Sequence, residues 1–130
     1  MTTRLLFVTD DATRTDGALG AALRGQGYVL QHCAIGTAPS LLRQHAAAID
    51  VVLLDVELAG IDGAALCRLV GEIAPRAVIV VLAARLDDAD MVRALHAGAD
   101  DYLTRPHRSP ELFARLRAHL RRATGSLPPQ

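Results

Sequence analysis

The sequence lacks lysine altogether and has no excess of charge of either sign. Its 14 basic residues are all arginine, and 14 aspartate and glutamate residues balance them. Non-specific attraction to nucleic acid depends on a basic excess that can neutralise phosphates. The overall charge therefore gives no support for direct contact with DNA or RNA by this segment.

Cysteine and long apolar runs are also scarce. Cys33 and Cys67 have neither metal-binding nor redox spacing, and they fit a reduced compartment. The first residues run straight into a strand-length apolar stretch rather than into a signal peptide. No apolar segment reaches the roughly 20 residues that a membrane span requires. We therefore expect a soluble, cytoplasmic chain with no membrane contact.

The sequence does contain a regular alternation of short apolar runs and amphipathic segments. A length of 130 residues with 51% apolar residues suits one domain with one core. That domain is expected over residues 1–123, with linker composition in the tail at 124–130. Runs rich in Val and Leu are typical of strands buried on both faces. Five βα repeats predict an α/β fold with a single doubly wound five-stranded parallel sheet. The expected strands are 4–9, 28–34, 49–55, 77–83 and 101–104, and the expected helices are 13–24, 39–48, 63–72, 87–97 and 109–122.

Carboxylates gather at the ends of two of the predicted strands. Asp10 and Asp11 directly follow the first strand, and Asp55 ends the third. In an open α/β sheet the carboxyl ends of the strands share one edge, where ligands bind. Like charges at one edge repel each other, and a hard divalent cation with oxygen ligands is the usual reason to gather them. A cation site is therefore predicted, and plain capping of the strand ends is the alternative.

Asp10–Asp11, Asp55, Gly60–Gly63 and Gly98–Pro106 follow one another in a fixed order and spacing. With these motifs the chain resembles the receiver domain of two-component response regulators. The resemblance covers about residues 4–122 and implies a flavodoxin-like receiver fold. Each motif alone is weak, but the set has the order and spacing of that family. The segment 112–122 is most similar to the subfamily of transcription factors with a winged-helix effector. Any DNA contact is then expected through an effector domain that is not in this chain.

The resemblance implies a role in phosphotransfer for Asp55. This residue would accept a phosphoryl group from a histidine kinase and thereby control dimerisation and an output, most simply transcription. Asp10, Asp11, Asp55 and the backbone carbonyl of Glu57 would hold Mg²⁺. The ion would neutralise developing charge and align the phosphoryl group. The chain is thus expected to be a signalling module and not an enzyme.

Two positions depart from the family pattern. Ala83 stands at the end of the fourth strand, where the family has Ser or Thr, and Arg105 replaces the usual Lys. In the family the hydroxyl binds a phosphoryl oxygen and makes room for an aromatic side chain, here Tyr102. Arginine is a planar fork and no equivalent of the lysine point charge. An atypical receiver is therefore expected. The alternative is a phosphorylation-independent receiver that is controlled by constitutive dimerisation or by a small ligand.

The subfamily also implies a two-fold homodimer. Its surface would consist of the predicted helix 87–97, the strand 101–104 and the helix 109–122. Apolar residues would form the centre of this interface and an ion pair would cross it. The expected residues are Val92, Leu95 and Phe113 at the centre, with Asp100 or Asp101 meeting Arg115 across it.

Two other classes of protein use a similar fold. A Mg²⁺-dependent phosphohydrolase has its aspartyl nucleophile after the first strand, with a second Asp two residues further on, whereas Asp10 and Asp11 are adjacent. A flavodoxin needs a hydroxyl-rich phosphate loop at that place, where two acids would repel the phosphate. Both classes fit the sequence less well than a receiver domain.

Overall fold

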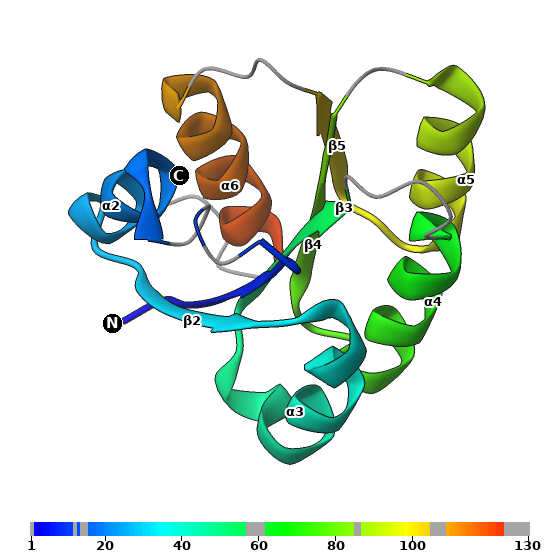
Figure 1. The fold of residues 1–130 in the computed structure, drawn as a ribbon, viewed down its shortest axis with the longest axis horizontal. Coiled ribbons are helices and arrows are strands. Elements are labelled where there is room, and N and C mark those ends of the chain that lie inside the picture. Colours follow the sequence, from blue (N-terminus) through cyan, green and yellow to red (C-terminus); the bar gives the residue numbers. More distant parts are fainter. Residues whose placement is uncertain are drawn as a thin grey trace.

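A five-stranded parallel sheet forms the centre of the molecule, in a computed structural model that describes residues 2–11, 13, 16–56, 62–84, 87–104 and 109–123. The strand order is β2-β1-β3-β4-β5 (Figure 1). This order places β3, the strand that carries Asp55, in the middle of the sheet, and it confirms the predicted doubly wound α/β fold. The strands are β1 (Arg4–Val8), β2 (Val29–Cys33), β3 (Val51–Val56), β4 (Val78–Ala83) and β5 (Asp101–Thr104).

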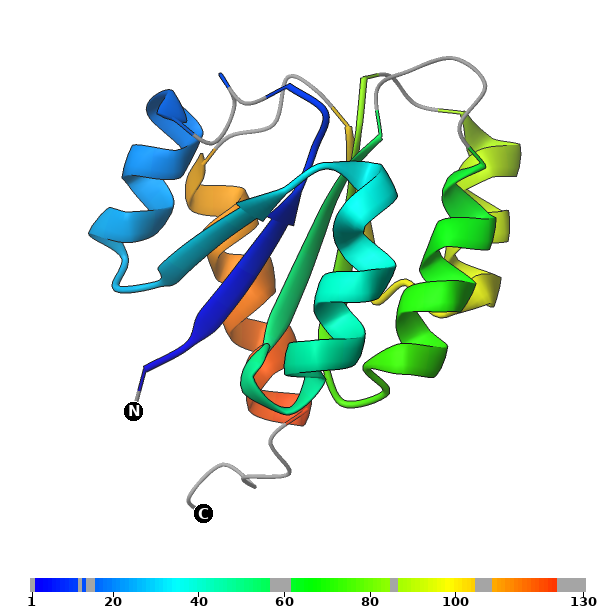
Figure 2. The same cartoon turned by 60° about the horizontal axis from the view of Figure 1, so that its bottom comes forward.

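Helices cover both faces of the sheet. α2 (Ala18–Gly25) and α6 (Ser109–Ala123) lie on one face. α3 (Ala38–His45), α4 (Gly63–Ile73) and α5 (Asp88–Ala97) lie side by side on the other (Figure 2). The predicted tail 124–130 lies outside the described residues.

Two helices differ from the sequence-based expectation. The helix predicted over 13–24 is interrupted: Thr13 and Asp16 are helical, but Gly17 has an extended backbone with φ −89° and ψ −157°, and α2 begins after it at Ala18. The helix predicted over 39–48 ends as an α-helix at His45 and continues as a 3₁₀ turn over Ala46–Ala48. Such turns are frequent at helix ends, and the apolar pattern does not distinguish them from α-helix. A second 3₁₀ turn spans Ile35–Thr37 after β2.

The strand residues alternate between two cores, one under each layer of helices. Leu5 and Phe7 of β1 pack with Leu23 of α2 and with Leu112 and Leu116 of α6. The intervening strand residues pack toward the opposite layer, where the core also contains Leu42 of α3, Cys67 and Val70 of α4, and Ala94 of α5. Residues 51–55 of β3 are all buried, so Asp55 lies near the carboxyl edge of a strand that is covered on both faces.

Local signals in the sequence fix the ends of α4 and α5. The Asp62 side chain accepts a hydrogen bond from the Ala65 N–H at 3.0 Å, and Asp87 accepts from Asp90 N–H at 3.1 Å. These are N-caps, since Asp is among the residues preferred at that position. Gly98 ends α5 with φ 125°, a conformation that favours glycine. Within the described residues, no helix is both long and apolar enough to cross a bilayer.

Candidate functional site

Asp55 is a buried carboxylate at the carboxyl edge of the central strand. It is the next-to-last residue of β3, pairs with Leu82 of β4, and is only 2% exposed. In the described part of the chain, the buried polar residues are Asp55 and Thr9, which is also 2% exposed. A buried carboxylate needs hydrogen bonds or a cation to offset the cost of desolvation. Its position is therefore costly unless neighbouring groups stabilise its charge.

Thr9 supplies one of these groups. Its hydroxyl donates to Asp55 Oδ2 at 3.0 Å. β1 pairs with β3 in parallel, with Val8 opposite Leu54. The next residues along the two strands, Thr9 and Asp55, therefore lie beside each other. Thr9 was not predicted as a site residue, because in the sequence it stands only as the end of an apolar run. Its one signal in the sequence was a hydroxyl at the end of an apolar run, and the register of β1 against β3 that brings it to Asp55 is known only from the structure.

Asp10 and Asp11 lie close to the same edge, but their side chains contact other groups. Asp10 Oδ1 accepts a hydrogen bond from the Ile35 N–H at 2.9 Å, at the start of the turn after β2. Asp11 Oδ1 accepts from the N–H and the hydroxyl of Thr13, at 3.0 and 2.5 Å. Both acids are exposed. Asp11 thus acts as a local turn residue, in the manner of the capping alternative.

The cation site remains a prediction. Within the part of the chain that the structure describes, no three His, Cys, Asp or Glu side chains are arranged to hold a metal ion. The chemistry of the donors fits Mg²⁺, because carboxylate oxygens are its preferred ligands. Asp10 and Asp11 would have to turn toward Asp55 to share one ion. The fourth predicted ligand, Glu57, lies outside the described residues.

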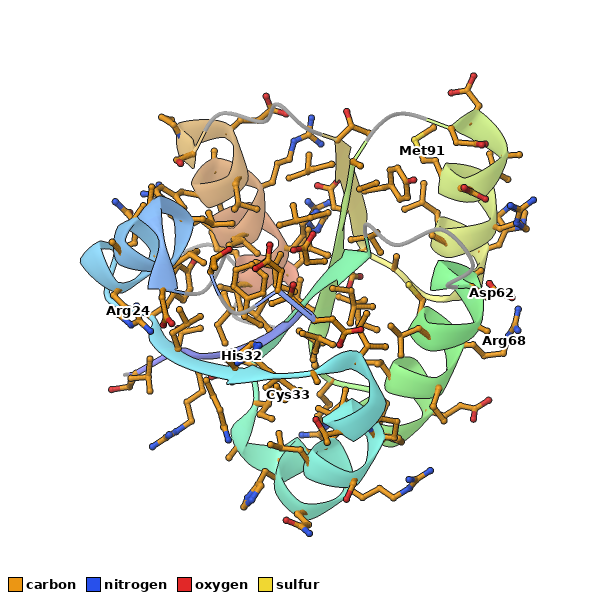
Figure 3. All side chains as sticks on the ribbon, in the orientation of Figure 1. Arg24, His32, Cys33, Asp62, Arg68 and Met91 are labelled. Atoms are coloured by element: carbon orange, nitrogen blue, oxygen red, sulfur yellow. The ribbon has the colours of Figure 1, made fainter. Side chains whose placement is uncertain are left out.

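His32 also approaches this edge, from β2. Its Nε2 lies 3.0 Å from the backbone carbonyl oxygen of Thr9. Because a carbonyl only accepts, this contact requires a proton on Nε2. Figure 3 shows His32 and Cys33 as neighbours on β2, beside β1. Sequence analysis assigned His32 no role, and no local motif marks it.

The predicted switch residues lie at the ends of β4 and β5. Ala83 is the last residue of β4, is 5% exposed, and pairs with Val56 and Thr104. Tyr102 of β5 is partly buried and packs against the core under α3, α4 and α5. Burial raises the pKa of Tyr102, and the carboxylates of Asp90 and Asp87 raise it further. Arg105 lies outside the described residues.

The residues predicted for the dimer interface lie on and around the β5 edge. Val92 and Leu95 of α5 are 48% and 40% exposed, while Phe113 of α6 is partly buried against the chain's own core. Met91, on the first half of α5 in Figure 3, is also partly buried. Asp100 pairs with β4 inside the chain, since its Oδ2 accepts from the Ile79 N–H at 2.8 Å.

Asp101 is also engaged within one chain. Arg115 donates to its two oxygens at 3.2 and 3.3 Å, and His119 Nε2 lies 2.9 Å from Oδ2. Burial alone would raise the pKa of Asp101, but hydrogen bonds from His119, the Tyr102 N–H and Arg115 together hold it below its usual value. Glu111 lies 3.3 Å from Arg115 and extends this charged cluster. His119 was not predicted, although it lies one turn of helix after Arg115.

Comparison with known proteins adds a family to this geometry. The family described as response regulator receiver domain matches residues 6–117. The chain is 42% identical over 123 residues to the transcriptional regulatory protein AfsQ1 of Streptomyces coelicolor, covering 94% of this chain and 52% of that protein. The chain thus spans about half the length of that curated relative.

Two solved structures are informative. A CheY-like response regulator receiver domain protein from Methanospirillum hungatei has a TM-score of 0.85 at 21% identity, covering 98% of this chain and 100% of that one, and shows the fold. A response regulator from Burkholderia pseudomallei has a TM-score of 0.76 at 25% identity, covering 95% of this chain and 71% of that one. The latter structure contains a phosphorylated aspartic acid, a calcium ion and citrate.

Proposed function

Because this chain belongs to the response regulator receiver family, we propose that Asp55 is its phosphoacceptor and that a histidine kinase is the phosphodonor. The observation that carries the proposal is the position of Asp55. It is a carboxylate that is 2% exposed, at the carboxyl edge of the central strand of the sheet. That is the edge at which doubly wound sheets place their ligands.

The reaction is a phosphoryl transfer to a carboxylate oxygen. A bond forms between an Asp55 oxygen and phosphorus, the bond from phosphorus to the donor nitrogen breaks, and its electron pair stays with the donor imidazole. The chain contributes a fixed, partly desolvated nucleophile, which is the part that a protein can supply to such chemistry. The Thr9 hydroxyl donates a hydrogen bond to Asp55 and helps to keep its carboxylate in place for this step.

Mg²⁺ is the proposed cofactor. When bound, it supplies charge neutralisation for the transferred group. Asp10, Asp11 and Asp55 would hold it, together with the backbone carbonyl of Glu57. Support comes from the placement of the three acids at neighbouring strand ends and from their oxygen donors.

Regulation of transcription is the proposed output. AfsQ1 is a transcriptional regulatory protein about twice as long as this chain, so DNA contact is assigned to a separate effector domain. Phosphorylation would act on a homodimer through α5, β5 and α6, where Val92 and Leu95 are exposed. This role would place the chain in the cytoplasm, with its kinase and its target DNA.

A second candidate is a receiver that works without phosphorylation. Ala83 favours it, because its methyl group offers no hydrogen-bond donor at the end of β4. Constitutive dimerisation or a small ligand would then control the output. The two candidates differ in one measurable property, the covalent modification of Asp55.

The test is intact-mass analysis after incubation with acetyl phosphate and Mg²⁺. The wild type should gain a single phosphoryl group slowly, and Asp55→Asn should gain none. Asp50→Asn is the matched control, because Asp50 precedes the same strand at the opposite edge and accepts from the Arg4 N–H. Equal uptake by Asp55→Asn would refute the assignment. A wild type that never gains mass would favour the phosphorylation-independent receiver.

A further inference from the structure

The Thr9 hydroxyl lies between two groups that fix its orientation. It accepts a hydrogen bond from the Asp11 N–H at 3.1 Å and donates to Asp55 Oδ2 at 3.0 Å. The backbone N–H can only donate and an ionised carboxylate can only accept. The hydroxyl proton therefore points at Asp55.

The backbone of Thr9 is held as firmly as its side chain. Its N–H donates to the Cys33 carbonyl at 3.0 Å, and its own carbonyl lies 3.0 Å from His32 Nε2. Thr9 is 2% exposed, as is Asp55. Four hydrogen bonds thus hold this buried donor in place beside the carboxylate.

On the other side of β3, no described residue at the end of β4 carries a hydroxyl. β4 is the other neighbour of β3, and it ends in Ala83, which is 5% exposed. The nearest strand-end hydroxyl of the described residues therefore comes from β1. The Thr9 hydroxyl is neutral, so it adds no negative charge beside Asp55, where a second carboxylate would repel the first.

We propose that Thr9 is a positioning residue for phosphorylation of Asp55, an inference that rests on the proposed function. Thr9 holds Oδ2 and thereby fixes the plane of the carboxylate, so that Oδ1 is the oxygen that attacks phosphorus. When the bond from Oδ1 to phosphorus forms and the bond to the donor breaks, Oδ2 becomes the carbonyl oxygen of the acyl phosphate. A carbonyl oxygen still accepts the Thr9 hydrogen bond, so the contact persists through the reaction.

The test measures the rate of acetyl phosphate uptake, with Mg²⁺, as a function of phosphodonor concentration. Thr9→Val, which removes the hydroxyl but keeps a β-branched side chain, should lower the maximal rate about tenfold, because an attacking group loses its fixed orientation. The phosphodonor concentration at half-maximal rate should stay unchanged, since Thr9 contacts the acceptor and not the donor. Thr9→Ser keeps the hydroxyl and should restore most of the rate.

Thr3→Val is the matched control, since Thr3 precedes β1 at the opposite edge of the sheet from Thr9. It should leave the rate unchanged. If Thr9→Val does not fold, as judged by circular dichroism, the pair Thr9→Ser and Thr9→Ala makes the same comparison, because the two differ by the hydroxyl alone.

The outcomes separate this inference from the proposed function. Uptake by the wild type at Asp55 with an equal maximal rate in Thr9→Val, or in Thr9→Ala if that pair is used, overturns the positioning role alone. A Thr9→Ser variant as slow as Thr9→Val also overturns it, because the hydroxyl would then not be the active feature. No uptake by the wild type overturns both, since there would be no reaction for Thr9 to support.

Discussion

Arg115 donates to the carboxylate of Asp101 within a single chain, with Nη1 at 3.2 and 3.3 Å from the two oxygens. The sequence had suggested that this arginine meets Asp100 or Asp101 across a dimer interface. In the structure both acids already have partners inside the chain, since Asp100 accepts from the Ile79 N–H. An ion pair across the interface would therefore have to replace an existing one, and it would contribute little to the free energy of association. Apolar contact is left as the main source of any dimer stability.

Leu95→Glu should therefore weaken self-association. Leu95 and Val92 are exposed apolar side chains on α5, and a charge in the buried centre of an interface is unfavourable. Sedimentation at high protein concentration should show a larger monomer fraction for this variant. The dissociation constant of the dimer should rise about tenfold. Val29→Glu is the control, because Val29 is 42% exposed on β2, at the opposite edge of the sheet.

Arg115→Glu gives an independent check of the same surface. It places a third carboxylate beside Asp101 and Glu111, and should also raise the monomer fraction. Arg43→Glu on α3, an exposed residue of the other helical layer, should not. Identical monomer fractions for the wild type, Leu95→Glu and Arg115→Glu would rule this face out.

Stability should fall in acid partly through Asp101. The pKa of its carboxyl is lower in the folded protein than its usual value, so the ionised form stabilises the fold at neutral pH. This contribution is complete above the unfolded-state pKa, about 3.9, and is lost as the pH falls through the folded-state pKa. Asp101→Asn should lower the free energy of unfolding at pH 7 by roughly 1.5 kcal/mol, as for hydrogen bonds to a charged group.

The measurement is urea unfolding of the wild type and Asp101→Asn from pH 7 to pH 3. The difference in free energy of unfolding between the two proteins should be constant above about pH 5 and should become smaller below about pH 4. Arg115→Gln, which leaves His119 and the Tyr102 N–H as donors, should reduce the narrowing only in part. A difference that does not change with pH would show that the charge of Asp101 does not stabilise the fold.

Removing charge at Asp10 should report on the cation site. Asp10→Asn keeps an oxygen that can accept from the Ile35 N–H, but it relieves repulsion with Asp11 and Asp55. The free energy of unfolding without metal should rise by about 1 kcal/mol, and the stabilisation by Mg²⁺ should disappear. Thermal unfolding with and without Mg²⁺ measures both effects. Asp50→Asn should keep the full response to Mg²⁺, and an equal response in Asp10→Asn would exclude Asp10 as a ligand.

The fold followed from the sequence because its signals are local. Short Val-rich and Leu-rich runs indicated the strands, and the amphipathic segments between them indicated helices, in the order that the structure confirms. Two details were not predicted: the break at Gly17 within the first helical segment, and the change from α-helix to 3₁₀ turn after His45. There the backbone of Gly17 and the geometry of a helix end decide the outcome, and neither leaves an apolar pattern.

The surroundings of Asp55 were less predictable. Its place at the end of a buried strand could be inferred from the run before it, but its contact with Thr9 depends on the register of β1 against β3. The partners of Asp10 and Asp101 likewise come from β2 and α6, at long distances along the chain. Long-range register has no signature in one sequence, so these contacts emerge only from the folded chain.

Restoring the usual residues of the family should repair the predicted switch. Ala83 offers no hydroxyl, and Arg105 replaces a lysine. A hydrogen bond to a charged group contributes roughly 1.5–3 kcal/mol, similar to the gap between the states of a two-state switch. Ala83 is 5% exposed, so a threonine there costs about 1–3 kcal/mol of packing strain. The variants must therefore be compared at a temperature where all are folded.

The double variant Ala83→Thr, Arg105→Lys should take up a phosphoryl group faster than the wild type and shift the NMR signals of Tyr102, which is partly buried at β5. The wild type should react slowly and the signals of Tyr102 should not shift, because Ala83 has no hydroxyl to bind a phosphoryl group on Asp55. The effects of the two single variants should not sum to that of the double variant, since both new groups would hold the same phosphoryl group. Intact mass after acetyl phosphate treatment gives the uptake, and Tyr102 ring signals give the response. Rapid, complete uptake by the wild type together with a full Tyr102 response would contradict this prediction and make the chain an ordinary receiver.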